Sequence, residues 1–272
     1  MNEVAGASNV RAAFPAHPGK DVIFDNGTTV ISLKKSRRKR HDAIVITFDP
    51  MMALDISKPA FGEAFLSEAG FDLITVQKRR ENWYQDVSDS DIAAITNAHR
   101  LNYGRVFTYG SSMGAYAALY FARSLNATAL AYSPRDPTYY RYAGDLAFTK
   151  RFNMTHRSLR EVGDSSTRHL VIFDPLNNID GPYFKQEVAP VFKAAIFGKL
   201  RYTAHPSIYA LHEARLIKDM ALEFFGNKFP NMRNIALATH TTRTYLTSLA
   251  AACDKRHPHW ASSIRSKILP SS

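Results

Sequence analysis

One segment of the chain combines a potential nucleophile with the glycines that a sharp turn needs. Residues 110–114 read Gly-Ser-Ser-Met-Gly, which has the form G-x-S-x-G centred on Ser112. A β-rich run, 106–109, comes directly before this motif, and small helix-forming residues follow it. In a strand-to-helix turn of this kind the glycines avoid collisions and the serine hydroxyl sits at a helix N-terminus. The pattern predicts a nucleophile; its alternative is an ordinary glycine-rich turn.

The motif lies within a longer alternation of short apolar runs and segments of helical character. Such an alternation is typical of a mostly parallel central sheet with helices on both faces, so the sequence predicts an α/β fold. The turn-forming Asp25-Asn26-Gly27 separates two β-rich runs, 21–24 and 28–33, which predicts an antiparallel hairpin. We expect the other strands at 43–48, 71–76, 105–109, 127–132, 169–173 and 199–203, and helices at 58–69, 89–100, 113–125, 183–195 and 207–225.

Two parts of the chain depart from this alternation. The segment from Pro134 to Arg168 is rich in Pro, Tyr and Arg and has only weak periodicity. It is too long for a simple connection, and insertions of this kind are often lids or binding loops. From Asn231 onward the apolar residues again show helical spacing, with a last helix expected at 261–269. This tail predicts a helical extension.

With this order of strand, turn and helix, the chain resembles the α/β-hydrolase superfamily over residues from about Ala43 to Phe225. The resemblance implies a serine nucleophile, an acid after a later strand and a histidine after the last strand, in that chain order. We therefore expect a domain of this type over residues 1–230, with a lid at about 134–168. The helical extension, 231–272, should pack on the same domain.

Two aspartates follow the strand expected at 169–173. Asp174 stands at the strand end itself, whereas Asp180 lies in the following turn, from which a carboxylate can reach across to the site. We favour Asp180 as the acid. The alternative for Asp174 is a cap that accepts backbone N–H groups, and the alternative for Asp180 is an ordinary Asp-Gly turn before the next helix.

The chain has ten histidines, so position must decide which one could act as a base. His205 directly follows the last expected strand and precedes the helix expected at 207–225, and we favour it for this reason. His212 falls inside that helix, where an imidazole more often packs or faces solvent. His99 and His156 are further alternatives.

The three side chains have complementary chemistry. The neutral imidazole of His205 would take the proton of Ser112 as the serine attacks a carbonyl carbon. Asp180 would hold the ring in the right tautomer and stabilise the imidazolium. The backbone N–H of Met113, one residue past the serine, would donate to the oxyanion.

A second oxyanion donor should come from the loop after the strand at 43–48. Pro50 has no N–H, so Phe48, Asp49 or Met51 must supply the donor, and we name Asp49. Two aromatic residues, Trp83 and Tyr84, follow the strand at 71–76 and could line a substrate wall; their alternative is loop packing.

The sequence carries no motif for a metal or a cofactor. We find no H-E-x-x-H, no Cys-x-x-Cys, no P-loop ending and no dinucleotide-binding G-x-G-x-x-G. We therefore expect a reaction that uses neither.

The charge balance is strongly basic, with 35 Lys and Arg against 24 Asp and Glu, a net charge of +11. Part of this excess lies in one run, Lys34 to Arg40, which could bind an acidic partner but is more often a solvated loop. Cys253 is the only cysteine, so an intrachain disulfide is excluded. The first twenty residues lack a secretory pattern and no apolar run reaches the roughly 20 residues of a membrane span, so we expect a cytoplasmic protein.

These observations predict a serine hydrolase that cleaves a carboxylic ester, or an amide or thioester, of a small molecule or glycan. One alternative is an acyltransferase or deacetylase acting on a polysaccharide, which uses the same acyl-enzyme. The other is a non-catalytic binding protein of the same fold that uses its basic loop and helical tail.

Overall fold

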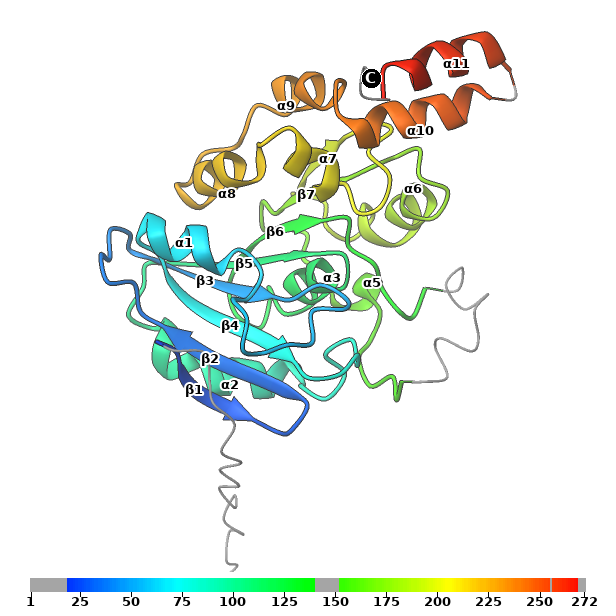
Figure 1. Ribbon diagram of the computed structural model, residues 1–272. Coiled ribbons are helices and arrows are strands. Elements are labelled where there is room, and N and C mark those ends of the chain that lie inside the picture. Colours follow the sequence, from blue (N-terminus) through cyan, green and yellow to red (C-terminus); the bar gives the residue numbers. More distant parts are fainter. Residues whose placement is uncertain (1–18, 140–151, 255, 269–272) are drawn as a thin grey trace, which may run out of the picture.

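The computed structural model describes residues 19–139, 152–254 and 256–268. One eight-stranded sheet crosses the molecule in the order β1-β2-β4-β3-β5-β6-β7-β8 (Figure 1). The six strands from β3 to β8 are parallel to one another, so the expected mostly parallel sheet is confirmed. The strands are β1 Asp21–Asp25, β2 Thr29–Lys34, β3 Ala43–Phe48, β4 Asp72–Lys78, β5 Arg105–Ser111, β6 Thr128–Tyr132, β7 Leu170–Phe173 and β8 Ile196–Lys199.

The predicted hairpin is also confirmed: β1 and β2 pair antiparallel, and β2 continues antiparallel onto β4. Its turn forms because the Asn26 side-chain oxygen accepts hydrogen bonds from the N–H groups of Thr28 and Thr29. Gly27 takes a left-handed conformation there, with φ of 85°.

Helices cover both faces of the sheet, as expected. Side chains alternate along each strand, so Ile44, Ile46 and Phe48 point to one core while Ala43 and Val45 point to the other. The first core is closed by α2, α3, α5, α6 and η1, and the second by α1, α7, α8 and α9. The helices are α1 Glu63–Ala69, α2 Asp89–Arg100, α3 Met113–Tyr120, α5 Leu159–Val162, α6 Asp180–Tyr183, the π-helix η1 Phe184–Val188, α7 Ile208–Glu213, α8 Ile217–Phe225, α9 Met232–Thr239, α10 Arg243–Cys253 and α11 Pro258–Ser266.

The last strand lies earlier than the sequence predicts. We expected it at 199–203, but β8 ends at Lys199 and the chain then turns. The turn forms because Tyr202 adopts a left-handed conformation, with φ of 60°, and the Thr203 hydroxyl donates to the Leu200 carbonyl. This turn brings the chain back toward the carboxyl end of β7.

Four helices are also shorter than predicted. Helix α1 begins at Glu63 instead of 58, and α3 ends at Tyr120 instead of 125. The helix expected at 207–225 is divided into α7 and α8, since Arg215 between them has φ of 59° and interrupts the helix. The helix expected at 183–195 ends by Val188 and includes a π-helical turn.

The C-terminal helices pack at one end of the molecule. Both α9 and α10 contact α7, and α10 forms a hairpin with α11 (Figure 1). Residues 140–151 of the expected lid, with Tyr140, Arg141 and Tyr142, lie outside the described residues. No helix among the described residues has the length and apolar character to cross a membrane.

The turn between β5 and α3 brings three backbone segments unusually close together. A Cβ on Gly110 would lie 2.2 Å from the carbonyl group of Gly114, and a Cβ on Gly114 would lie 2.3 Å from the Phe48 carbonyl oxygen. Glycine is therefore required at both positions by space rather than by φ.

We expect Gly114→Ala to lower the free energy of unfolding by about 1–3 kcal/mol, because the new methyl group would collide with the Phe48 backbone. In a helix without this collision the same change would raise stability by about 1 kcal/mol, since alanine is the better helix former. Urea unfolding followed by circular dichroism gives the sign. An unchanged or raised midpoint would contradict the close approach.

Candidate active site

Ser112 lies in the bend between β5 and α3. Its backbone has φ of 54° and ψ of −114°, a strained conformation for a residue with a side chain. Two hydrogen bonds hold this conformation: the Ser112 N–H donates to the Tyr132 carbonyl at 2.8 Å, and its own carbonyl accepts from the Tyr116 N–H at 3.0 Å. The hydroxyl thus lies at the start of α3, where N–H groups have no intrahelical acceptor.

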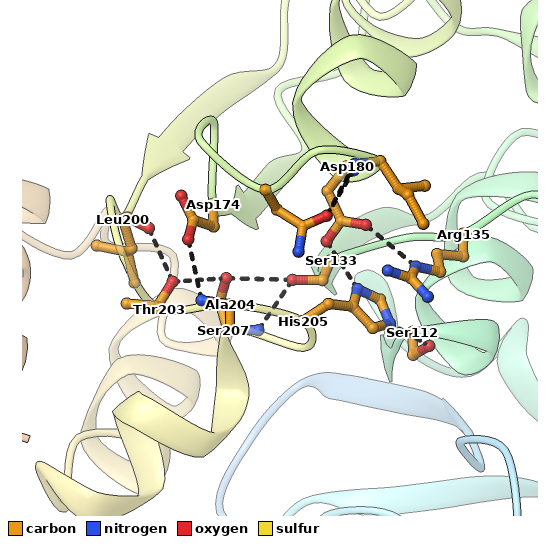
Figure 2. Close-up of polar contacts among 12 residues, drawn as sticks. Ser112, Ser133, Arg135, Asp174, Asp180, Leu200, Thr203, Ala204, His205 and Ser207 are labelled. Atoms are coloured by element: carbon orange, nitrogen blue, oxygen red, sulfur yellow. Dashed lines mark hydrogen bonds and ion pairs between the residues drawn. The ribbon is translucent and has the colours of Figure 1, made fainter. Parts of the chain in front are cut away.

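The structure brings three of the predicted side chains into one hydrogen-bonded chain. The Ser112 Oγ lies 2.9 Å from His205 Nε2, and the His205 Nδ1 lies 2.7 Å from Asp180 Oδ2. Figure 2 shows the imidazole between the carboxylate and the serine. His205 comes from the loop before α7 and Asp180 from the first residue of α6, so the site is assembled from three separate chain segments.

The ring of His205 is in an environment that disfavours its charged form. Burial is the largest effect and lowers its pKa below the usual 6.5. The carboxylate of Asp180 acts in the opposite direction through its hydrogen bond and its charge, whereas the guanidinium of Arg135 lowers the pKa further. The net effect favours a neutral imidazole at pH 7, which is the form that can accept a proton.

Asp174 has the structural role that was its alternative. One of its oxygens accepts from the Ala204 N–H at 2.9 Å and the other from the Leu176 N–H at 2.9 Å. Its carboxylate therefore ties the end of β7 to the backbone just before His205. Burial raises the pKa of Asp174, and the backbone hydrogen bonds oppose this shift.

A small hydroxyl network supports the same loop from below. The Ser133 hydroxyl accepts from the Ser207 N–H at 3.0 Å and donates to the Ser207 hydroxyl at 3.2 Å. The Thr203 hydroxyl also contacts the Ser207 hydroxyl, at 2.9 Å (Figure 2). These contacts are buried, so the backbone on both sides of His205 has fixed partners.

The prediction that the Asp49 N–H is the second oxyanion donor is wrong. Its backbone N–H donates to the Val76 carbonyl, at 3.3 Å, because the pairing of β3 with β4 continues one residue past the strand end. Its buried side chain accepts from the Phe61 N–H and from the Gln77 amide. Both the N–H and the carboxylate of Asp49 are therefore already engaged in contacts with β4 and with the segment before α1.

The position of Lys78 determines the direction of another N–H group in the same loop, that of Met51. This fully buried lysine donates from Nζ to the Pro50 carbonyl at 2.7 Å and to the Ala53 carbonyl at 3.3 Å. A trans peptide places its N–H opposite its C=O, so the Met51 N–H points away from Lys78. Met51 also lines the cavity that contains Ser112.

A cavity of about 500 Å³ opens at the serine. Its walls are mostly apolar, and Arg135 and His205 bring the charged and titratable groups. Its other lining residues are Pro50, Met51, Met52, Trp83, Ser112, Pro137, Pro206 and Tyr209.

Of the two aromatic residues predicted to form a wall, Trp83 lines the cavity and Tyr84 does not. The Tyr84 ring is fully buried and its hydroxyl donates to the Asp49 carbonyl at 2.7 Å. The prediction for Tyr84 is therefore wrong: its left-handed backbone, with φ of 58°, accompanies a ring that packs inward and holds the loop.

The other candidate histidines lie apart from this arrangement. His212 is exposed on α7 and His99 lies in the last turn of α2. His156 is buried, with the Tyr116 hydroxyl 3.0 Å from its Nδ1 and the Val87 carbonyl 2.8 Å from its Nε2. Burial lowers the pKa of His156, which fits a packing role.

Arg135 is the residue that the sequence did not connect with the site. Its Nε donates to Asp180 Oδ1 at 3.1 Å, and its backbone N–H donates to the Ser112 carbonyl at 3.4 Å. The sequence signal for it is its place three residues after Tyr132, the last residue of β6, at the same sheet edge as Ser112.

The basic run is partly neutralised. Lys34 pairs with Glu63 at 2.8 Å, and Lys35 contacts Asp72 at 3.4 Å, while Arg37 and Arg40 are exposed. Within residues 19–139, 152–254 and 256–268, no three His, Cys, Asp or Glu side chains lie close enough together to hold a metal ion.

The sheet order, the bend at Ser112 and the place of the site at the carboxyl ends of the strands define the α/β-hydrolase fold, and this chain has that fold. It is similar to Est1E from Butyrivibrio proteoclasticus, with a TM-score of 0.53 at 14% identity over 77% of this chain and 98% of the other. It is also similar to esterase 2 from Thermogutta terrifontis in its apo form, with a TM-score of 0.52 at 13% identity over 80% and 98%. No protein-family model and no curated protein sequence matches this chain.

We expect Asp174→Asn to lower the free energy of unfolding by about 1–3 kcal/mol, because the amide would present a donor to a backbone N–H that needs an acceptor. The matched control is Asp21→Asn at an exposed position of β1, which should change stability by less than about 0.5 kcal/mol. Urea unfolding of both variants is the measurement. Equal effects would contradict the anchoring role of Asp174.

Proposed function

We propose that this protein is a serine hydrolase that cleaves a carboxylic ester. The observation that carries the proposal is the unbroken chain from Asp180 through His205 to a serine hydroxyl in a strained bend. A hydroxyl, a neutral imidazole and a buried carboxylate in this order match the needs of nucleophilic acyl transfer. The fold shared with an esterase from Thermogutta terrifontis supports an ester as the substrate.

In the proposed mechanism His205 Nε2 takes the Ser112 proton while the serine oxygen bonds to the ester carbonyl carbon. The resulting imidazolium donates through Nδ1 to Asp180, which stabilises its charge. When the tetrahedral intermediate collapses, His205 gives the proton to the leaving alcohol. Water then attacks the acyl-enzyme by the same route, with His205 as base, and releases the acid.

The negative charge on the substrate oxygen needs two donors in this mechanism. Met113 supplies one N–H from the first residue of α3, where the helix dipole also favours negative charge. We propose the Met51 N–H as the second, because the Lys78 contact with the Pro50 carbonyl orients that peptide.

The cavity supports a small-molecule ester with an apolar portion. Two methionines and Trp83 contribute apolar surface that can adapt to different acyl groups. The expected lid contributes Arg135 and Pro137 to the same wall, so we propose that this segment helps to set specificity.

We expect a fluorophosphonate probe to label the intact protein on Ser112, and Ser112→Ala to abolish labelling. Ser111→Ala is the matched control, because Ser111 is the neighbouring buried serine of the same motif and should be dispensable. Turnover of an aryl acetate should fall by about 10³ to 10⁶-fold in Ser112→Ala alone. Peptide mass spectrometry locates the label.

A folded protein that neither reacts with the probe nor hydrolyses aryl esters would contradict this proposal. That result would favour the alternative of a non-catalytic binding protein with this fold.

We expect Lys78→Met to lower kcat for an aryl acetate with little change in KM. Complete loss of an oxyanion donor lowers kcat by about 10²–10³-fold. In Lys78→Met the donor would be misplaced but still present, so we expect a decrease in kcat of up to about 10²-fold. Lys58→Met is the control, since Lys58 lies near the same loop but is exposed. Steady-state kinetics on variants shown to be folded by circular dichroism decide, and an unaltered kcat in Lys78→Met would remove Met51 from the mechanism.

A further inference from the structure

Two groups share the buried carboxylate of Asp180. His205 Nδ1 contacts one oxygen at 2.7 Å, and Arg135 Nε contacts the other at 3.1 Å (Figure 2). The Asp180 side chain is only 2% exposed, so both contacts are made in a poorly solvated environment. The imidazole therefore faces a carboxylate whose charge is already partly compensated by a permanent cation.

The place of Arg135 is fixed by the fold and does not depend on its side chain alone. It lies three residues after the end of β6 and two after Ser133, whose left-handed backbone, with φ of 49°, turns the chain there. The Arg135 N–H then contacts the Ser112 carbonyl at 3.4 Å. Arg135 thus contacts the Ser112 backbone through its own backbone N–H and Asp180 through its guanidinium.

The charged and titratable groups around His205 come from several elements. Asp180 faces it from α6, Arg135 from the segment after β6, and Tyr209 from α7 on the cavity wall. Asp174, at the end of β7, accepts the N–H of the residue before His205. Of the two aspartates, only Asp180 contacts the ring, so the effective counter-charge of the imidazole depends on how strongly Arg135 competes for it.

We propose that Arg135 is a positioning residue that sets the acid limit of the reaction: by sharing Asp180, it keeps His205 neutral and able to accept a proton at lower pH than an unshared pair would. The expected effect on the reaction rate rests on the proposed function. The expected effect on the pKa of the His205 ring does not depend on that function.

The sign follows from the charges. An imidazolium is stabilised by Asp180 and repelled by Arg135, and Arg135 lowers the pKa of His205 accordingly. Removing the guanidinium leaves the full carboxylate charge to His205 and raises its pKa. The protonated, inactive fraction then grows at any given acidic pH, so the acid limb of the rate profile moves to higher pH.

The test compares the intact protein with Arg135→Gln, which keeps a hydrogen-bond donor but loses the charge, and with Arg135→Lys, which keeps a charge. Arg157→Gln is the control, because Arg157 is an exposed arginine paired loosely with Asp89 at 3.9 Å. The rate of fluorophosphonate labelling is measured from pH 4.5 to 9. We expect the acid limb of the Arg135→Gln profile to lie about 0.5 to 1 pH unit higher than that of the intact protein. The shift is of this modest size because solvent partly screens the charge of the Arg135 side chain.

The limbs of Arg135→Lys and Arg157→Gln should stay near that of the intact protein. A uniformly slower Arg135→Gln with an unmoved limb would show a merely structural role and overturn the inference. So would an equal shift in Arg157→Gln.

Nuclear magnetic resonance titration of the His205 ring provides a second readout that needs no reaction. In the intact protein the pKa of His205 should lie below the usual 6.5. In Arg135→Gln the pKa of His205 should be higher than in the intact protein. If Arg135→Gln does not fold, a His205 titration at or above 6.5 in the intact protein overturns the inference by itself. A protein that never reacts with the probe contradicts the proposed function, whereas an unmoved titration contradicts only the role of Arg135.

Discussion

The geometry of the site depends on a backbone contact that no side chain could occupy. Gly110 packs against Gly114, and Gly114 packs against the carbonyl of Phe48, the last residue of β3. Phe48 and Gly110 are direct neighbours in the parallel pairing of β3 with β5. The sheet register therefore places the ends of β3 and β5 next to each other and next to the start of α3. The strained conformation of Ser112 is therefore maintained by main-chain packing, which tolerates little relaxation.

The other groups of the site reach Ser112 because parallel strands end at one edge of the sheet. Two of the loops at that edge are anchored by buried side chains. Lys78 and Tyr84 hold the carbonyls of the segment after β3, and Asp174 holds the segment that follows β8. The loops are thus fixed by buried polar contacts, while the cavity above them is mostly apolar.

The sequence predicts a large part of this arrangement. Strand β3 and helix α2 have the predicted bounds, because continuous apolar runs and the capping residue Ser88 mark their ends clearly. The chain order of serine, aspartate and histidine fits Ser112 and His205 with either Asp174 or Asp180, and the place of Asp180 in the turn after the strand favours the aspartate that the structure brings to His205.

The incorrect predictions have tertiary causes that a linear pattern does not contain. The N–H of Asp49 is already used because β-pairing continues beyond the strand, and Tyr84 faces inward with its hydroxyl on a loop carbonyl. The contact of Arg135 with Asp180 could not be predicted, because it joins residues 45 positions apart, across two different loops. Such tertiary contacts follow from register and loop conformation, not from residue type or spacing.

The separate duties of the two aspartates have a consequence for how this fold can change over time. Asp174 accepts N–H groups of the main chain beside the imidazole, whereas Asp180 contacts two side chains, the His205 ring and the Arg135 guanidinium. A descendant or a redesigned chain that loses Asp180 would still display an imidazole above the same hollow. Such a chain would keep the preformed pocket but not the complete hydrogen-bonded chain from Asp180 to Ser112, so the two features can change separately.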